Sequence, residues 1–241
     1  MSDRWIRAGS ALLALALLSA APALAAGKIA GTIKYEGRIP NLRPLAMDAD
    51  PACAAKHNSP VKPELLVVGS GNGLANVLVR VTSGLPEGQS FPKPAQPVVM
   101  DQNGCVYTPH VMGVMVGQQF KVKNSDGLLH NVHSLSEENP PFNKAMPANV
   151  TEADYTFSKE ETFRIKCDVH PWMGSFVAVM EHPFFDVSGM DGSYTIEGLP
   201  EGTYTIEAWH EFERFPAQTQ TVTIAGDETK TVDFTFKGPS S

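Results

Sequence analysis

Residues 163–180 read FRIKCDVHPWMGSFVAVM, and this stretch decides the fold class. In its first part Phe163, Ile165 and Cys167 alternate with the basic side chains of Arg164 and Lys166. A period of two is typical of a β-strand that buries one face. A second strand pattern, ending at residue 180, follows after a short loop. The stretch therefore predicts two neighbouring strands joined by a tight loop that carries sulfur and imidazole side chains.

The same period of two recurs along most of the chain after residue 27. It is clear at residues 29–35, 77–81 and 119–123, and Gly, Pro, Asn or Asp residues stand at the breaks. Two proline-rich stretches, residues 37–63 and 83–97, predict long loops. The acidic and polar residues 136–161 predict a surface excursion with a short turn of helix. We predict an all-β protein.

The texture of the sequence changes after about residue 182. Residues 193–197 (SYTIE) and 203–207 (TYTIE) are nearly the same strand twice, and the GLPEG segment between them is typical of a hairpin turn. Alternating strands at 218–224 and 230–236 follow. We therefore predict a first domain at residues 27–182 and a small β-sandwich module at residues 183–238.

Residues 1–26 have the pattern of an export signal peptide. Arg4 and Arg7 form a basic head, residues 11–18 (ALLALALL) form the apolar centre, and residues 23–25 (ALA) offer a cleavage site. A membrane anchor is the alternative, but the apolar run is too short to span a bilayer. No later stretch could cross a membrane. We expect the mature protein in a bacterial periplasm, where disulfides can form.

The charge of the chain excludes one class of partner. The 241 residues include 19 Lys and Arg against 26 Asp and Glu, which gives a formal net charge of −7. A nucleic-acid-binding protein would normally carry a basic face, so we expect no nucleic-acid partner. The 42% of hydrophobic residues is enough to build a core.

The loop after residue 166 contains the most specific chemical pattern. Cys167, His170 and Met173 place a thiol, an imidazole and a thioether at intervals of three residues. Such soft donors suit copper better than a hard ion, and His130 can supply the second imidazole that a trigonal site needs. Zinc is a minor alternative because structural zinc sites seldom use methionine. In the other interpretation, Cys167 is a buried thiol and His170 a surface histidine.

These residues resemble a known family, the type 1 (blue) copper proteins or cupredoxins. The similarity covers residues 113–181, and the short ligand loop is most similar to that of the amicyanins, with plastocyanins more distant. It implies an antiparallel Greek-key β-sandwich that holds one type 1 copper ion near one end. His130, Cys167 and His170 would be the equatorial ligands and Met173 the long axial ligand.

The resemblance also implies roles around these ligands. Asn131 would tie the two ligand loops together by hydrogen bonds. Asp168 departs from the family, which often has Ser or Thr after the ligand cysteine, and as an anionic neighbour it would favour Cu(II). Pro171 and Trp172 would form the apolar patch where redox partners dock. For His133 we expect a structural or exposed role, with a metal role as the alternative.

The other two cysteines can then be interpreted. If Cys167 binds copper, Cys53 and Cys105 remain, and in an oxidising compartment they can pair. We predict this disulfide. The alternative is that Cys105 and His110 belong to another metal site.

The C-terminal module resembles a second family. Residues 188–204 are similar to the carboxypeptidase regulatory-like, transthyretin-like β domain, a widespread accessory module. Residues 30–33 (AGTI) resemble the first strand of that family, so we expect the N-terminal strand to pair with the C-terminal module. No peptidase residues accompany the similarity.

Together these features predict a periplasmic electron carrier rather than an enzyme. We expect a monomer whose partner is a redox protein such as a c-type cytochrome or a periplasmic dehydrogenase. The alternative is a copper-binding carrier or sensor without electron transfer, for which Met112, Met115 and Met146 could form a soft Cu(I) site.

Overall fold

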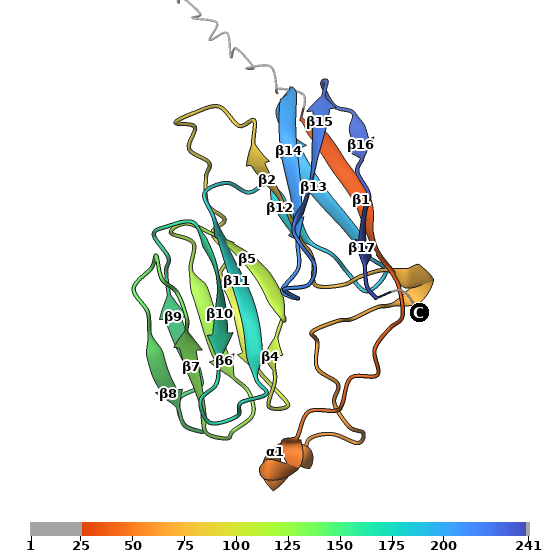
Figure 1. The fold of residues 1–241 in the computed structure, drawn as a ribbon. Coiled ribbons are helices and arrows are strands. Elements are labelled where there is room, and N and C mark those ends of the chain that lie inside the picture. The colour runs from red at the N-terminus through yellow and green to blue at the C-terminus, as the bar shows by residue number, and fades with distance from the viewer. Residues whose placement is uncertain (1–25, 240–241) are drawn as a thin grey trace, which may run out of the picture.

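The computed structural model describes residues 26–239, and the predicted signal peptide lies outside these residues except for Ala26. The described chain is all-β, as predicted, and folds into two β-sandwiches connected by long loops (Figure 1). No helix within residues 26–239 is long and apolar enough to cross a membrane.

The first sandwich holds the predicted ligand loop, and we call it the metal-side sandwich. One sheet has the order β5-β11-β10-β7-β8 and the other the order β4-β3-β6-β9. The strands of the first sheet are β5 (Val111–Met115), β11 (Gly174–Met180), β10 (Glu161–Lys166), β7 (His130–Ser134) and β8 (Asn143–Met146). Those of the second sheet are β4 (Tyr107–Thr108), β3 (Val98–Gln102), β6 (Phe120–Asn124) and β9 (Glu152–Tyr155). The inward residues of both sheets form one apolar core.

The second sandwich contains the C-terminal strands. Its sheets are β13-β1-β16, with β17 also paired to β1, and β12-β2-β14-β15. The strands are β1 (Gly27–Glu36), β2 (Leu78–Ser83), β12 (Phe185–Val187), β13 (Ser193–Leu199), β14 (Gly202–Trp209), β15 (Gln218–Ile224), β16 (Thr229–Thr231) and β17 (Phe234–Lys237). The predicted hairpin is β13 and β14, but these strands lie in different sheets and pair with β1 and β2 instead of with each other.

The expected pairing of the N-terminal strand with the C-terminal module is confirmed. β1 pairs antiparallel with β13 and parallel with β16 and β17. β2 also joins this sandwich, between β12 and β14. The structure thus differs from a division at residue 182, because the first 83 residues contribute two strands to the C-terminal module. Alternating patterns identify strands but carry no information on which distant strand each one pairs with.

The acidic segment 136–161 differs from its expected form. It contains no helix and instead supplies the edge strands β8 and β9, with β10 starting at its end. Its carboxylate Glu161 accepts hydrogen bonds from the backbone of Glu137 and from Ser136 and Asn139. These hydrogen bonds satisfy polar groups of this segment without a helix.

An apolar junction joins the two sandwiches. Leu78 of β2 packs with Val111, Ala178 and Met180 of the metal-side sandwich. At Gly113 a Cβ atom would lie only 2.2 Å from the ring of Phe185, so this glycine lets the ring rest on β5. The junction fixes how the two sandwiches meet.

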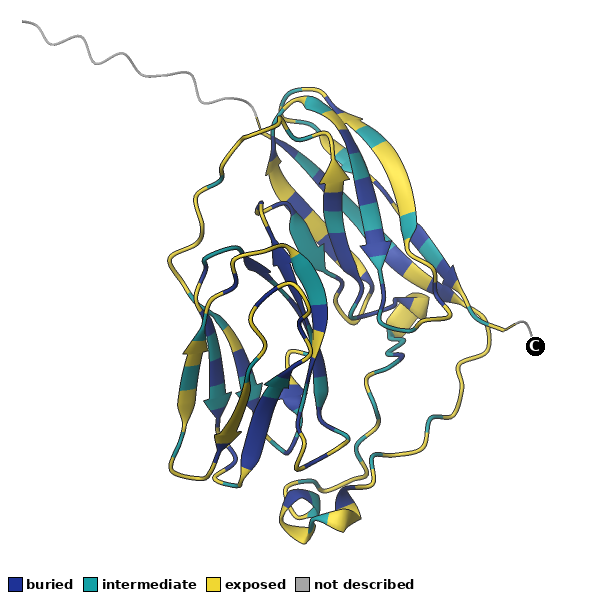
Figure 2. Cartoon of the chain, turned by 60° about the vertical axis from the view of Figure 1, so that its left-hand side comes forward, coloured by how far each residue is buried: buried dark blue, intermediate teal, exposed yellow. Residues whose placement is uncertain are grey.

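A long segment, residues 37–65, leaves β1 and runs beside the metal-side sandwich before it returns; we call it the cap. It contains the 3-10 turn η1 (Met47–Ala49) and the short helix α1 (Pro51–Ala54), and a second 3-10 turn, η2 (Ser70–Asn72), follows it. Figure 2 shows the cap as mostly exposed chain whose buried positions gather in the helical turns. Met47 and Cys53 are these buried positions.

We expect a pH-dependent contribution to stability from the junction. His110 contacts Glu211 through Nε2, and its Nδ1 lies 3.7 Å from Glu64. Burial is the largest single influence and would lower the pKa of His110, but Glu211, Glu64 and the carbonyl of Gly174 together outweigh it and raise the pKa above 6.5. A raised pKa stabilises the fold fully below the unfolded-state pKa, and this contribution is lost as the pH rises through the folded-state pKa.

The variant Glu211→Gln should therefore lose about 1 kcal/mol of unfolding free energy near pH 5.5, and less at higher pH. Urea unfolding of both proteins from pH 5.5 to 9 measures the difference, with the exposed neighbour Glu213→Gln as the control. A difference that stays constant over this range would contradict the assignment.

Candidate metal centre

The four predicted ligands come from two loops at one end of the metal-side sandwich. His130 is the first residue of β7, and Cys167 directly follows β10. β7 and β10 are antiparallel, with Lys166 opposite His133, so the start of one strand lies beside the end of the other. His170 and Met173 lie in the loop that leads into β11. The fold therefore brings together residues that are 37 positions apart in the sequence.

Three donor atoms converge at this end of the sandwich. His130, Cys167 and His170 each offer a ligand atom within 4.8 Å of the others. The two histidine Nδ1 atoms are 2.9 Å apart, and the thiol sulfur lies 3.9 Å from Nδ1 of His170. The two imidazoles thus turn the same ring nitrogen toward one point. This arrangement suits a metal ion bound by two Nδ1 atoms and a thiolate.

The ligand loop is closed by its own backbone. Cys167 donates its N–H to the carbonyl of Met173 at 3.2 Å, and Met173 donates to the carbonyl of His170 at 2.9 Å. The N–H of His170 points at the Cys167 sulfur, 3.4 Å away. The residues of the loop are therefore held in place by the polypeptide itself, and the predicted axial residue Met173 belongs to the same closed turn.

The cluster is shielded from solvent. The exposed fractions are 0% for His130, 2% for Cys167, 2% for His170 and 1% for Met173. A buried thiol beside two imidazoles is a soft, preformed donor set. This donor set fits copper, since the chain places two imidazole nitrogens and one cysteine sulfur at the centre and keeps the carboxylates outside it.

Burial and neighbouring groups shift the pKa of the Cys167 thiol in opposite directions. Burial would raise the pKa of Cys167, but His130 and nearby backbone N–H groups lower it to about 7. Burial would likewise lower the pKa of His130, while Asp126 and Cys167 raise it to about 9. The thiolate is the form that binds metals, so the surroundings favour the ligating state of Cys167.

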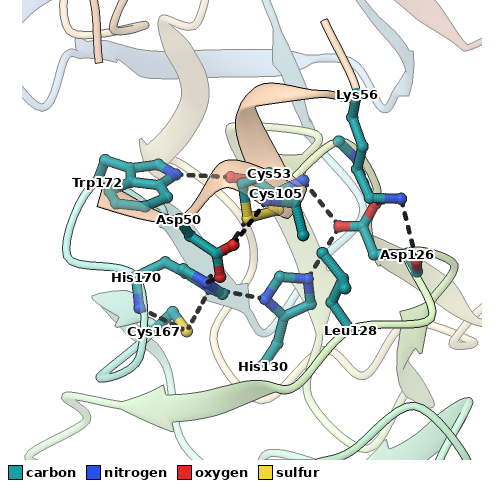
Figure 3. Close-up of a disulfide and its surroundings, with 12 residues drawn as sticks. Asp50, Cys53, Lys56, Cys105, Asp126, Leu128, His130, Cys167, His170 and Trp172 are labelled. Atoms are coloured by element: carbon teal, nitrogen blue, oxygen red, sulfur yellow. Dashed lines mark hydrogen bonds and ion pairs between the residues drawn. A yellow bond between two sulfur atoms is a disulfide. The ribbon is translucent and has the colours of Figure 1, made fainter. Parts of the chain in front are cut away.

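A carboxylate contacts the Nε2 atom of each imidazole, on the side of the ring away from Nδ1 (Figure 3). Nε2 of His130 is 2.9 Å from Asp126, and Nε2 of His170 is 3.1 Å from Asp50. Asp126 also accepts the N–H groups of Gly104 and Cys105 at 2.6 and 2.7 Å. Neither carboxylate was predicted from the sequence, although Asp126 lies only four residues before His130.

Asn131 joins the two ligand loops, as the resemblance implied. Its Oδ1 accepts the N–H of Asp168 at 2.5 Å and that of Val169 at 3.3 Å. The Asp168 carboxylate accepts from Asn131, Asn143 and His133, and pairs with Lys166 at 2.8 Å. His133 is thus held outside the cluster by Asp168, and Asp168 connects the ligand loop to β7 and β8.

The predicted disulfide between Cys53 and Cys105 is present, which leaves Cys167 as the free cysteine of residues 26–239. It ties α1 of the cap to the end of the metal-side sandwich. Cys105 is therefore not available for a metal site with His110, and His110 instead contacts Glu211.

The cap changes the surroundings of the expected docking patch. Asp50 and Cys53 cover Nε2 of His170, with the Cys53 sulfur 3.6 Å away. Trp172 is half-buried and donates its indole N–H to the carbonyl of Cys105 at 3.0 Å, whereas Pro171 is exposed. The edge of His170 is thus closed to a partner, and the exposed surface near it belongs to Pro171 and its neighbour Val169.

The three methionines considered as a soft site lie in the core. Met112, Met115 and Met146 are each at most 4% exposed. Met146 accepts a hydrogen bond from Gln102 through its sulfur. They are packing residues of the metal-side sandwich.

Comparisons with known proteins identify no family. No protein-family model matches the sequence, and no curated protein sequence matches it. Among solved structures, a Cu-containing nitrite reductase from Thermus scotoductus SA-01 is 22% identical over 42% of this chain and 26% of its own, with a TM-score of 0.34. This chain thus matches about a quarter of the length of the nitrite reductase.

For two further solved structures, the match covers almost their whole length. A purple cupredoxin from Nitrosopumilus maritimus is 20% identical over 34% of this chain and 99% of its own, with a TM-score of 0.30. An oxidised mutant of amicyanin is 20% identical over 42% of this chain and 98% of its own, with a TM-score of 0.32. The assignment of the site depends on its own geometry.

The disulfide should contribute strongly to stability because it closes a loop with a sequence separation of 52 residues. We expect the double variant Cys53→Ala/Cys105→Ala to lose about 4 kcal/mol of unfolding free energy in the chain-entropy view. Denaturant unfolding of the metal-free protein measures the loss, and Cys167→Ala, which keeps the disulfide, is the control. A loss below about 1 kcal/mol would mean that the cap is held by its non-covalent contacts.

Proposed function

We propose that the protein binds one type 1 copper ion through His130, Cys167 and His170, with Met173 as the axial ligand. The observation that carries this proposal is the convergence of two Nδ1 atoms and one thiol in a buried cluster. A thiolate with two imidazoles and a weak thioether is the donor set of blue copper sites. Bound copper would supply a one-electron couple between Cu(I) and Cu(II).

We further propose that the protein carries single electrons between redox partners and is not an enzyme. The residues of the chain support such a role because they hold the donors in a closed loop that needs little movement. All four proposed ligands are almost fully buried, which favours exclusion of water and of small substrates. A carrier needs only an electron path to its surface, whereas an oxidase or reductase needs an open coordination position.

Two further features of the chain bear on its location and its partners. A disulfide between Cys53 and Cys105 suits an oxidising compartment, in keeping with the proposed bacterial periplasm. Leu129 and Val169, each next to a proposed ligand, are large apolar residues exposed by 50% and 44%. Together with Pro171 and Trp172 they would offer an apolar docking surface for a c-type cytochrome or a periplasmic dehydrogenase. We expect weak, transient contacts with a monomeric protein.

The proposal is tested by the visible spectrum of the purified protein with one equivalent of Cu(II). We expect an intense thiolate-to-copper band that is absent from Cys167→Ala and weaker or shifted in Met173→Leu, since the thiolate provides the band and the axial ligand tunes it. His133→Ala, which changes a histidine outside the cluster, should retain the band. Weak copper binding without this band would refute the type 1 assignment.

The alternative function is a copper carrier or sensor without electron transfer. The two functions differ in what happens to the metal upon reduction. For an electron carrier we expect a reversible one-electron wave in voltammetry, and copper retained when the reduced protein is incubated with a Cu(I) chelator. Transfer of the copper to the chelator within minutes would favour the copper carrier instead.

A further inference from the structure

Two carboxylates, Asp50 and Asp126, contact the Nε2 atoms of the proposed copper histidines, on the side of each ring away from Nδ1. We propose that Asp50 and Asp126 are positioning residues that aim His170 and His130 at the metal and stabilise Cu(II), and that the Cys53–Cys105 disulfide holds the two carboxylates in place. This inference rests on the proposed copper site. It adds residues that lie outside the ligand set.

Asp126 is the more firmly held of the two. Its side chain is fully buried, with Oδ2 2.9 Å from Nε2 of His130. The N–H groups of Gly104 and Cys105 fix its two oxygens, and Lys56 lies 3.1 Å from Oδ1. Gly104 and Cys105 both have positive φ values, so the turn presents its two successive N–H groups to the carboxylate. The carboxylate cannot rotate away from the imidazole without losing these bonds.

Asp50 belongs to the cap. It precedes α1, where Oδ1 accepts the N–H of Ala52 at 2.9 Å, while Oδ2 lies 3.1 Å from Nε2 of His170. The cap therefore uses one oxygen to start its own helix and the other to hold the metal-site imidazole. The Asp50 side chain is 37% exposed, so its effect on the metal should be weaker than that of Asp126.

The disulfide links the segment that carries Asp50 to the turn that binds Asp126. Cys53 lies in α1, three residues after Asp50, and Cys105 donates its N–H to Asp126. Figure 3 shows the sulfur bridge between the two carboxylates, above the pair of imidazoles. Lys56 and His57 add contacts between the cap and the carbonyls of Asp126 and Gly104, at 3.0 and 2.7 Å. The carboxylates, the disulfide and these contacts form one connected unit.

The chemical consequence follows from the direction of the hydrogen bonds. An imidazole that donates Nε2–H to a carboxylate keeps Nδ1 free of its proton and more basic, which favours metal binding through Nδ1. The two negative charges also stabilise Cu(II) more than Cu(I), because the ion of higher charge gains more from them. Compared with a site that lacks these two charges, we expect a lower reduction potential and a higher affinity for Cu(II).

The test compares Asp126→Asn and Asp50→Asn with Asp48→Asn, an exposed acid of the same cap. Asparagine keeps the size of the side chain and a carbonyl oxygen but removes the charge. We expect all three variants to keep the thiolate-to-copper band. The Cu(II) affinity, measured by competition with a chelator, should fall about 10- to 100-fold in Asp126→Asn and less in Asp50→Asn. The reduction potential should rise in the same order and stay unchanged in Asp48→Asn.

The role of the disulfide is tested by a double-mutant cycle. If the bridge holds Asp50 in place, Cys53→Ala/Cys105→Ala should itself raise the potential, and Asp50→Asn should then add little in that background. Circular dichroism reports whether each variant folds. If Asp126→Asn does not fold, Asp50→Asn and the cycle still decide the matter, because Asp50 lies on the cap outside the core.

Zn(II) affinity in the same variants separates this inference from the copper proposal. If no variant shows the blue band but Zn(II) affinity falls in Asp126→Asn, the copper proposal fails and the positioning role stands. If the band is present while the affinities and potentials of Asp50→Asn and Asp126→Asn match those of Asp48→Asn, the positioning role is overturned. A potential that falls in either variant would overturn it as well.

Discussion

Two imidazoles are buried at one end of a β-sandwich, and each of their ring nitrogens needs a polar partner. This need determines which side chains can surround them. Each ring presents Nδ1 to the thiol and needs a partner for Nε2, because an unpaired buried polar atom costs about 1–3 kcal/mol. Asp126 and Asp50 meet this need. A buried carboxylate in turn needs donors, and the turn at residues 104–105 and Lys56 provide them for Asp126.

The cap lies in the connection between two strands of the C-terminal module. β1 lies in the C-terminal module, paired with β13, β16 and β17. β2, the next strand along the chain, belongs to the same module, and between the two strands the chain leaves that module, passes the metal-side sandwich and returns. Residues 37–65 form this excursion, with α1 at its far end (Figure 1), and the disulfide fixes α1 next to the proposed metal site. The cap is thus a connection between two strands of one sandwich that covers the site at the end of the other.

The closed site bears on two requirements of the proposed electron-carrier function. The ligands must keep one geometry in both oxidation states, and buried, hydrogen-bonded donors meet this demand. Electrons must also reach a partner, and the cover over His170 restricts where this can occur. The exposed side chains of Leu129 and Val169 are attached to the same two loops as the ligands. They keep an apolar surface within reach although the imidazole edge itself is closed.

The sequence by itself determined the all-β class and the spacing of Cys167 and His170 in one loop, because alternation and short spacing are local properties of the chain. The pairing of Cys53 with Cys105 could be predicted by elimination, once Cys167 was taken as a proposed ligand in an oxidising compartment. The role of Asn131 as a tie between the two ligand loops was implied by the resemblance of the ligand motifs to a known family, and its contacts with Asp168 and Val169 agree with it. Only the tertiary structure decided that β1 and β2 belong to the C-terminal module and that Asp50 lies against His170, 120 residues away. Strand partners and contacts across such separations depend on which surfaces pack together, and a single sequence does not record that choice.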